Sequence, residues 1–240
     1  MGGPLPGTTG LLSTHLPLGD DPRDREPITG AFGAVDAILR HPRRLLYWMR
    51  QGGAGGGVTV VLALVAVVCS LVYGVVVGSF SGATQLWAAP VKIAGGLLAS
   101  AIICLPSLFI FACLSGARAR LADVCGLVAG LLALMTILLV GFAPVAWVFS
   151  QSTDSVAAMG ALHLIFWAVA CGFSLRFLQN GFIHLGGRAP ALRSWMLLFL
   201  LVMLQMSTSL RPLVGTAPSL FPSPTEKRFF LGHWLECMKK

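Results

Sequence analysis

Five long apolar stretches separated by short polar breaks decide what this chain can fold into. They cover residues 58–80, 89–114, 124–149, 159–177 and 195–210. A helix that rises about 1.5 Å per residue needs about 20 mainly apolar residues to cross a hydrocarbon layer about 30 Å thick, and it pairs its backbone groups within itself. We therefore expect an all-α fold, a polytopic transmembrane helical bundle with five spans.

The composition excludes an ordinary soluble domain. Apolar residues make up 56% of the 240 residues and charged residues 11%, whereas about 25% of the residues of soluble domains are charged. The formal charge of +8 comes from basic residues spread over the ends of the apolar stretches. Nucleic-acid binding would instead need a basic stripe or patch. We expect no nucleic-acid partner, and we expect anionic lipid headgroups to face these charges.

The distribution of arginines predicts the orientation of the bundle. The loops at 81–88 and 150–158 contain no Lys or Arg, whereas the segments before span one, between spans two and three, and between spans four and five contain several. The positive-inside rule then places the N-terminus in the cytoplasm and the C-terminus outside, although five basic residues after residue 210 oppose this orientation. The first 57 residues contain no signal-peptide pattern, and the Ala, Gly, Val and Arg bias is typical of a bacterial cytoplasmic (inner) membrane protein. The arginines are Arg40, Arg43, Arg44, Arg50, Arg118, Arg120, Arg176, Arg188 and Arg193.

The chain divides into four segments. Residues 1–30 are rich in Gly, Pro and Asp and predict a disordered cytoplasmic tail. Residues 31–51 predict an amphipathic helix broken at Pro42, which acts either as a juxtamembrane anchor in the headgroup plane or as a protein-docking element. Residues 58–210 form the membrane domain. Residues 211–240 predict an outer tail with a second amphipathic helix, which begins at the capping box SPTE at 223–226.

Pairs of small residues four positions apart predict the surfaces where the helices pack. Apolar area gives helices no drive to associate in lipid, so residues that let backbones approach mark the contacts. These contacts lie either inside the bundle or between copies of the chain. The pairs are Gly74 and Gly78, Gly126 and Gly130, and Ala168 and Gly172.

Polar side chains gather at the predicted outer third of the bundle. Ionisable groups inside a membrane are costly and are therefore functional candidates. One interpretation is a vestibule that binds an anionic headgroup or a small solute through Lys92 and Arg211. The other is structural: Lys92 reaches the interface or pairs with Asp154, and His163 bonds a carbonyl group. The candidate residues are Lys92, Asp154, His163, Arg211, Gln85 and Gln151.

The sequence contains no catalytic, metal or cofactor signature. It has no HExxH, GxSxG or Walker motif and no paired intramembrane carboxylates, and its cysteines lack zinc spacing. Asp123, at the border of span three, is expected to pair with Arg118 or Arg120. We therefore expect a protein that is not an enzyme and that needs no metal or cofactor.

Two resemblances add to this reading. The motif RHPRR at 40–44, five spans, a cytoplasmic N-terminus and an outer C-terminus resemble the Yip (Ypt/Rab-interacting) superfamily over about residues 31–210. The stretches GSFSGATQLWAAP at 78–90 and GFAPVAWVFSQS at 141–152 are similar to uncharacterised bacterial multi-pass membrane proteins. The Yip resemblance implies a membrane-shaping or trafficking adaptor and no catalysis.

The leading hypothesis is a non-enzymatic scaffold or accessory subunit of a membrane complex. It would contact a membrane-protein partner, or a second copy of the chain, through the small-residue pairs and the two amphipathic helices. The alternative is a small-solute or lipid transporter or channel that uses the outer vestibule.

Overall fold

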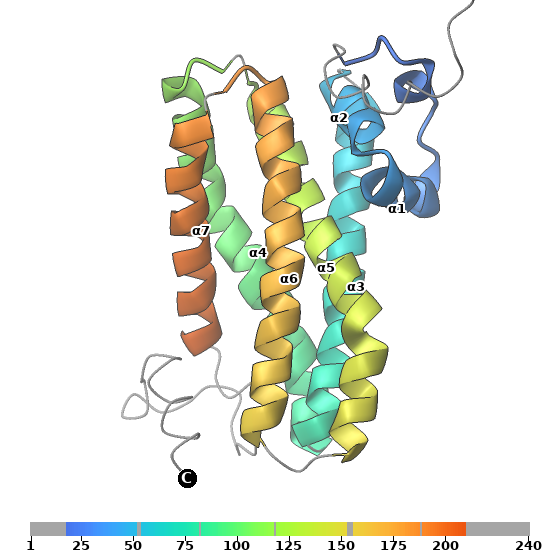
Figure 1. Ribbon diagram of the computed structural model, residues 1–240, viewed down its shortest axis with the longest axis vertical. Coiled ribbons are helices and arrows are strands. Elements are labelled where there is room, and N and C mark those ends of the chain that lie inside the picture. Colours follow the sequence, from blue (N-terminus) through green and yellow to red (C-terminus); the bar gives the residue numbers. More distant parts are fainter. Residues whose placement is uncertain are drawn as a thin grey trace, which may run out of the picture.

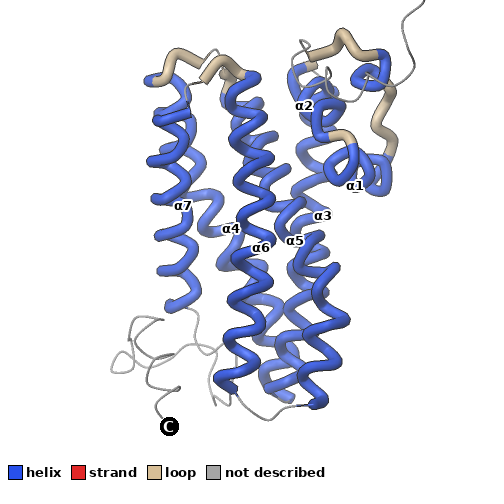
Figure 2. The backbone as a smooth tube through the Cα atoms, in the orientation of Figure 1, coloured by secondary structure: helices blue, strands red, loops and turns tan. Residues whose placement is uncertain are grey.

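The computed structural model describes residues 18–51, 54–81, 83–117, 119–152, 156–187 and 189–209. Within these residues the regular structure is entirely helical, with seven α-helices and one short 3-10 helix (Figure 2). The all-α prediction is confirmed for this part of the chain. The elements are η1 (Pro22–Arg25), α1 (Gly30–Arg40), α2 (Pro42–Arg50), α3 (Ala54–Ser81), α4 (Ala83–Leu114), α5 (Leu121–Ser152), α6 (Val156–His184) and α7 (Ala189–Ser209).

The long helices α3 to α7 run up and down, each antiparallel to the one before (Figure 1). One end of the bundle carries α1 and α2 together with the start of α3, the α4–α5 connection and the α6–α7 connection. The opposite end carries the α3–α4 and α5–α6 connections and the end of α7. This alternation places the first and last long helices so that the chain enters and leaves at opposite ends.

Four of these helices are long and apolar enough to cross a bilayer. Their candidate spans are Gly55–Ser79, Leu86–Leu114, Leu121–Ser152 and Ala158–His184, of 25, 29, 32 and 27 residues. In α7 the described apolar segment is the shorter Leu192–Leu204. Four such helices indicate an integral membrane protein whose apolar surface meets lipid.

Helix α5 forms the centre of the bundle. Buried residues make up 72% of its most apolar window, against 33–39% in the other three candidate spans. It packs against α3 and α6, while α4 packs against α3 and α7. The side chains of Leu131, Met135 and Leu139 along α5 are at most 1% exposed, whereas Leu64 on α3 and Ile102 on α4 are exposed on the outside of the bundle.

Two glycines allow the central helices to approach closely. A methyl group on Gly74 of α3 would collide with the backbone of Pro90 in α4. A methyl group on Gly130 of α5 would lie 2.6 Å from Cε1 of Phe177 in α6. The absence of a side chain at these two positions therefore sets the spacing of α3 from α4 and of α5 from α6.

Residues 18–50 pack against the end of the bundle where α3 and α5 begin, and we call them the N-terminal collar. The helix breaks at His41, and Pro42 begins α2, as the proline predicts, because a proline fits the first turn of a helix without the loss of a hydrogen bond. The inner face of the collar is buried through Ala37, Ile38 and Leu45. The apolar face of the predicted interfacial helix therefore packs largely on the protein itself, and Phe32, at 93% exposed, remains on its outer side.

The predicted segment boundaries remain predictions. Residues 18–30, within the predicted disordered tail, include η1 and carry the specific contacts described below. The predicted outer tail at 211–240 with its amphipathic helix lies outside the described residues.

Candidate functional site

The predicted vestibule residues differ in burial, and two of them lie outside the described part of the chain. Lys92 and His163 are buried, with exposures of 4% and 7%. Gln151 is exposed near the end of α5. Gln85 lies in α4, and its side chain is not among those described. Asp154 and Arg211 lie outside the described residues.

Tyr73 joins His163 across the bundle. Its hydroxyl lies 2.7 Å from Nδ1 of His163, and the two rings meet edge to face with centroids 5.7 Å apart. Phe166, one turn further along α6, contacts the same imidazole and stacks on Phe142 of α5. Sequence reasoning missed Tyr73, although it is one of only two tyrosines in the chain and the only one inside an apolar stretch. A buried tyrosine hydroxyl in an apolar helix needs a hydrogen-bond partner, and this requirement could have identified Tyr73 as a candidate from the sequence.

Two buried side-chain nitrogens have no hydrogen-bond partner among the described residues. They are Nζ of Lys92 and Nε2 of His163. A buried Tyr73 hydroxyl that donates to Nδ1 satisfies its own hydrogen and leaves the proton of the imidazole on Nε2. The opposite assignment would leave the tyrosine hydrogen without an acceptor. Both unpartnered atoms are therefore hydrogen-bond donors.

Tyr73, Lys92 and His163 lie at about the same height along the bundle. Tyr73 lies eight residues before the end of α3, Lys92 nine residues after the start of α4 and His163 seven residues after the start of α6. At about 1.5 Å per residue, each lies roughly 10 to 14 Å from the end of the bundle opposite the collar. Residue contacts tie these three helices together at the same level: Tyr73 meets His163, and the neighbouring Gly74 meets Pro90, two residues before Lys92.

Asp123 and Arg120 pair at the collar end. The Arg120 guanidinium lies 3.1 Å from Oδ1 of Asp123, and the Arg120 backbone N–H donates to Oδ2 at 2.9 Å. The hydrogen bond and the charge of Asp123 raise the pKa of Arg120. Arg120 also donates to the backbone oxygen of Arg50 at 3.2 Å. Of the two predicted partners of Asp123 the structure shows Arg120, and Arg118 lies outside the described residues.

Ion pairs and hydrogen bonds fasten the first part of the collar to α2. Asp24, which is 4% exposed, lies 3.6 Å from Arg43 and accepts from the backbone of Gly19. Trp48 donates its indole N–H to the backbone oxygen of Glu26 at 2.8 Å. Arg44 donates to the same oxygen at 3.0 Å and to that of Pro27 at 2.7 Å. The basic residues of α2 thus order the acidic segment before them.

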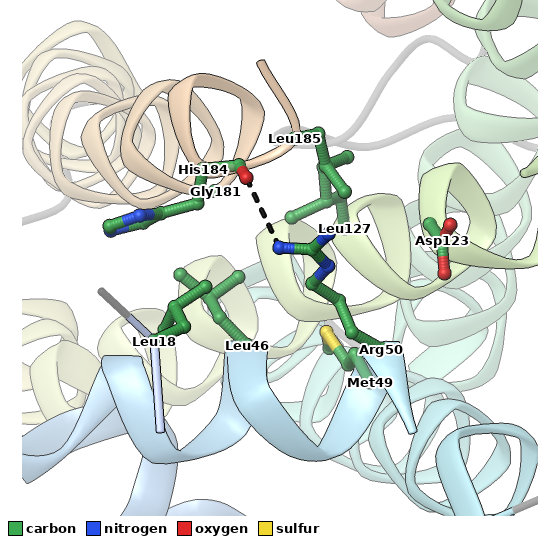
Figure 3. A pocket seen from close by; sticks show the side chains of 9 residues that line it. All are labelled: Leu18, Leu46, Met49, Arg50, Asp123, Leu127, Gly181, His184 and Leu185. Atoms are coloured by element: carbon green, nitrogen blue, oxygen red, sulfur yellow. Dashed lines mark hydrogen bonds between the residues drawn. The ribbon is translucent and has the colours of Figure 1, made fainter. Parts of the chain in front are cut away.

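A small pocket lies where α2 crosses the ends of α5 and α6 (Figure 3). Arg50 reaches across it and donates to the backbone oxygen of His184 at 3.4 Å. Its cavity volume is about 10 Å³, which is room for about one water molecule. The pocket is a gap in the packing between collar and bundle, and it is too small for a solute. Its lining residues are Leu18, Leu46, Met49, Arg50, Asp123, Leu127, Gly181, His184 and Leu185.

The three predicted small-residue pairs lie on different surfaces. Gly74, Gly78, Gly126 and Gly130 are buried in the bundle. Ala168 and Gly172 are exposed on α6, and a methyl group added to Gly172 would meet no atom within 4 Å. The third pair is thus left without a neighbour in the described part of the chain.

The described residues contain no group of three or more His, Cys, Asp or Glu side chains that could hold a metal ion. Their five cysteines are free, and they are Cys69, Cys104, Cys113, Cys125 and Cys171. Comparison of the chain with protein families, with curated proteins and with solved structures gave no match. The residues and their geometry therefore carry the functional argument.

Proposed function

We propose that the chain crosses the membrane five times, with α7 as the fifth span. Helix α7 has 21 residues, close to the about 20 that a crossing needs, and it packs along α4. The arginines of the collar and of the α4–α5 and α6–α7 connections then face the cytoplasm, and the C-terminus lies outside. The proposed location is the bacterial cytoplasmic membrane.

We propose that the protein is a non-enzymatic scaffold or accessory subunit of a membrane complex. The observation that carries this proposal is the exposed pair Ala168 and Gly172 on α6. Small residues on a lipid-facing surface let another helix approach closely, and in this chain the other two pairs are already occupied by internal packing. The partner on α6 is a helix of another membrane protein or of a second copy of this chain.

The collar supports the same proposal. Ion pairs and hydrogen bonds hold the collar together as one packed unit, and Arg50 bonds it to the end of the bundle. The collar exposes Phe32 and the side chain of Arg40, which is 77% exposed. A surface that exposes both a large aromatic residue and a basic side chain suits an anionic bilayer surface or a docked protein. The resemblance of the RHPRR motif at 40–44 to the Yip superfamily suggests an adaptor role within this proposal.

Co-purification in a mild detergent tests the scaffold proposal. We expect wild-type protein to retain a defined partner or to form a dimer, and Gly172→Leu to lose it because the new side chain fills the contact. Gly141→Leu is the matched control, since Gly141 is also an exposed helical glycine with open space around it. Retention of the same partner by the Gly172→Leu variant would reject the α6 surface, and a monomer without partners in the wild type would reject the scaffold.

The second candidate function is a small-solute or lipid transporter or channel. The observation that favours it is the buried Lys92, whose Nζ has no hydrogen-bond partner among the described residues, because ionisable groups inside membrane bundles usually lie on solute or ion pathways. Flux through liposomes that depends on Lys92 would favour this function over the scaffold.

A further inference from the structure

Helix α1 has two faces, and the protein covers only one of them. Ala34, Ala37 and Ile38 are at most 2% exposed, and the helix contacts α3 and α5. Phe32 and Leu39, two turns apart on the opposite face, are 93% and 47% exposed. Single exposed apolar residues are common on protein surfaces, so the depth of α1 along the bundle decides what these two side chains contact.

The collar lies beside the first turns of the long helices. A methyl group on Gly126 or Gly130, five and nine residues into α5, would lie 3.4 or 3.5 Å from the side chain of Met49 in α2. Met49 is therefore about 7 to 14 Å from the start of α5. Figure 1 shows α1 on the flank of the bundle beside α3, farther from this end than α2.

This depth matches the edge of a bilayer. The candidate span Leu121–Ser152 has 32 residues, so it is about 48 Å long, whereas the hydrocarbon core is about 30 Å thick. A span centred on that core extends about 9 Å beyond it at each end. The collar residues beside Gly126 and Gly130, and α1 beyond them, thus lie where headgroups meet acyl chains.

The surroundings of α1 are apolar on one side and basic on the other. Val60 and Leu64, in the first half of the α3 helix that α1 contacts, are 59% and 60% exposed. Arg40, at the end of α1, pairs through Nε with Asp36 at 3.3 Å, and its side chain is 77% exposed. Because this pair uses Nε, the two terminal amino groups of the guanidinium can donate to a phosphate.

We propose that the outer face of α1 is a lipid-docking surface in the leaflet at the collar end. Phe32 and Leu39 insert among the acyl chains, and Arg40 binds the phosphate of an anionic headgroup. Interfacial helices bury their apolar face about 5–10 Å into this boundary. Because the other face of α1 packs on α3 and α5, the helix holds the collar and the bundle at a fixed depth. The inference rests on the proposed crossing of α3 and chooses the bilayer over a docked protein as the partner of this face.

Photocrosslinking in bacterial membranes that contain the full chain tests the proposal. The photoreactive amino acid p-benzoylphenylalanine replaces Phe32, whose shape it resembles, and reacts with C–H groups in contact with it. Mass spectrometry of the irradiated, purified protein separates adducts with phospholipid, with another protein and with a second copy of the chain. We expect phospholipid to be the main adduct. The same label in place of Leu39 repeats the test at the second position of the face.

Two control positions calibrate the adducts. Val60 is an exposed residue of the candidate span Gly55–Ser79 and should give phospholipid adducts. Arg23 is an exposed residue of η1, which lies in the same collar beyond α2 (Figure 1), and should give few. Absence of phospholipid adducts at Val60 would reject the crossing of α3, whereas adducts at Val60 and none at Phe32 or Leu39 would reject the α1 surface alone.

The headgroup is tested in nanodiscs with equal parts of phosphatidylglycerol and phosphatidylcholine. With the label in place of Phe32, we expect adducts with phosphatidylglycerol to exceed those with phosphatidylcholine. Arg40→Gln should lower that ratio by about fivefold, the contribution of one basic side chain at an anionic membrane surface, and Arg40→Lys should keep it. Circular dichroism checks that each labelled variant folds.

Three results would overturn the proposal. The first is a main adduct of Phe32 with another protein or with a second copy of the chain. The second is equal labelling of phospholipid from Arg23 and from Phe32. The third is a ratio of the two lipids that Arg40→Gln leaves unchanged, which would reject the phosphate contact of Arg40.

Discussion

Replacement of single glycines by alanine tests whether backbone contact sets the spacing of the helices. At Gly74 the new methyl group meets the backbone of Pro90, which cannot rotate away. At Gly130 it meets the Phe177 ring at 2.6 Å, and that ring can turn at some cost in packing. At Gly141 it meets open space. The three sites thus form a graded series with the same chemical change.

The expected magnitudes follow from two opposing terms. Alanine favours a helix over glycine by up to about 1 kcal/mol, and this gain is common to the three variants. Overpacking of a close contact costs about 1–3 kcal/mol and sometimes more. We therefore expect Gly74→Ala to lower the free energy of unfolding by about 1–2 kcal/mol net, Gly130→Ala to lower it less, and Gly141→Ala to leave it unchanged or raise it slightly.

Unfolding followed by circular dichroism in detergent, with sodium dodecyl sulfate as denaturant, measures these differences. Comparison with Gly141→Ala cancels the common helix term, so the difference isolates the packing. Equal stability of Gly74→Ala and Gly141→Ala would refute the close approach of α3 and α4. We argue that the backbone of Pro90 can move away from a new methyl group less easily than the ring of Phe177 can. A Gly130→Ala variant that is less stable than Gly74→Ala would refute this argument.

Three further predictions concern the contacts that tie elements together. Trp195→Phe removes the donor to the Cys104 oxygen at 3.2 Å and to Ser107 at 3.0 Å, so it should cost about 1–3 kcal/mol of unfolding free energy, whereas Trp147→Phe at a half-exposed position should cost almost nothing in the same denaturation assay. Asp123→Asn removes the charge that holds Arg120, and we expect the apparent unfolding temperature to fall by a few degrees, an outcome that an unchanged melting curve would contradict. Trp48→Phe frees the oxygen of Glu26 from its indole donor, so trypsin should cleave faster after Arg23 and Arg25 than in wild-type protein, and equal cleavage rates would show that this bond does not hold the collar.

The four long apolar helices were predictable because their signal is long and redundant. Each apolar stretch contains about 20 residues whose summed hydropathy decides the outcome, so an error of a few residues at either end changes little. The helix break at Pro42 was predictable for a different reason, since a proline fits best in the first turn of a helix and disfavours the helical conformation of the residue before it.

The contacts between helices were predictable only in part. The small-residue pattern marks close approach but does not say which helix approaches, so the sequence could not distinguish buried Gly130 from exposed Gly172. Tyr73 and His163 are 90 residues apart, and no periodicity links them. The order in residues 18–30 depends on pairing of Asp24 with Arg43 and of Glu26 with α2, and composition alone does not reveal such long-range partners.

The central claim is that these apolar helices cross a bilayer an odd number of times, with the collar in the cytoplasm. Dual reporter fusions, with one reporter active only inside the cell and one only outside, measure this directly when they are placed after residues 51, 82, 118, 154, 188 and 240. We expect alternating sides that begin inside at 51 and end outside at 240. Reporters at 51 and 240 on the same side, or release of the protein from membranes by alkaline carbonate, would contradict it.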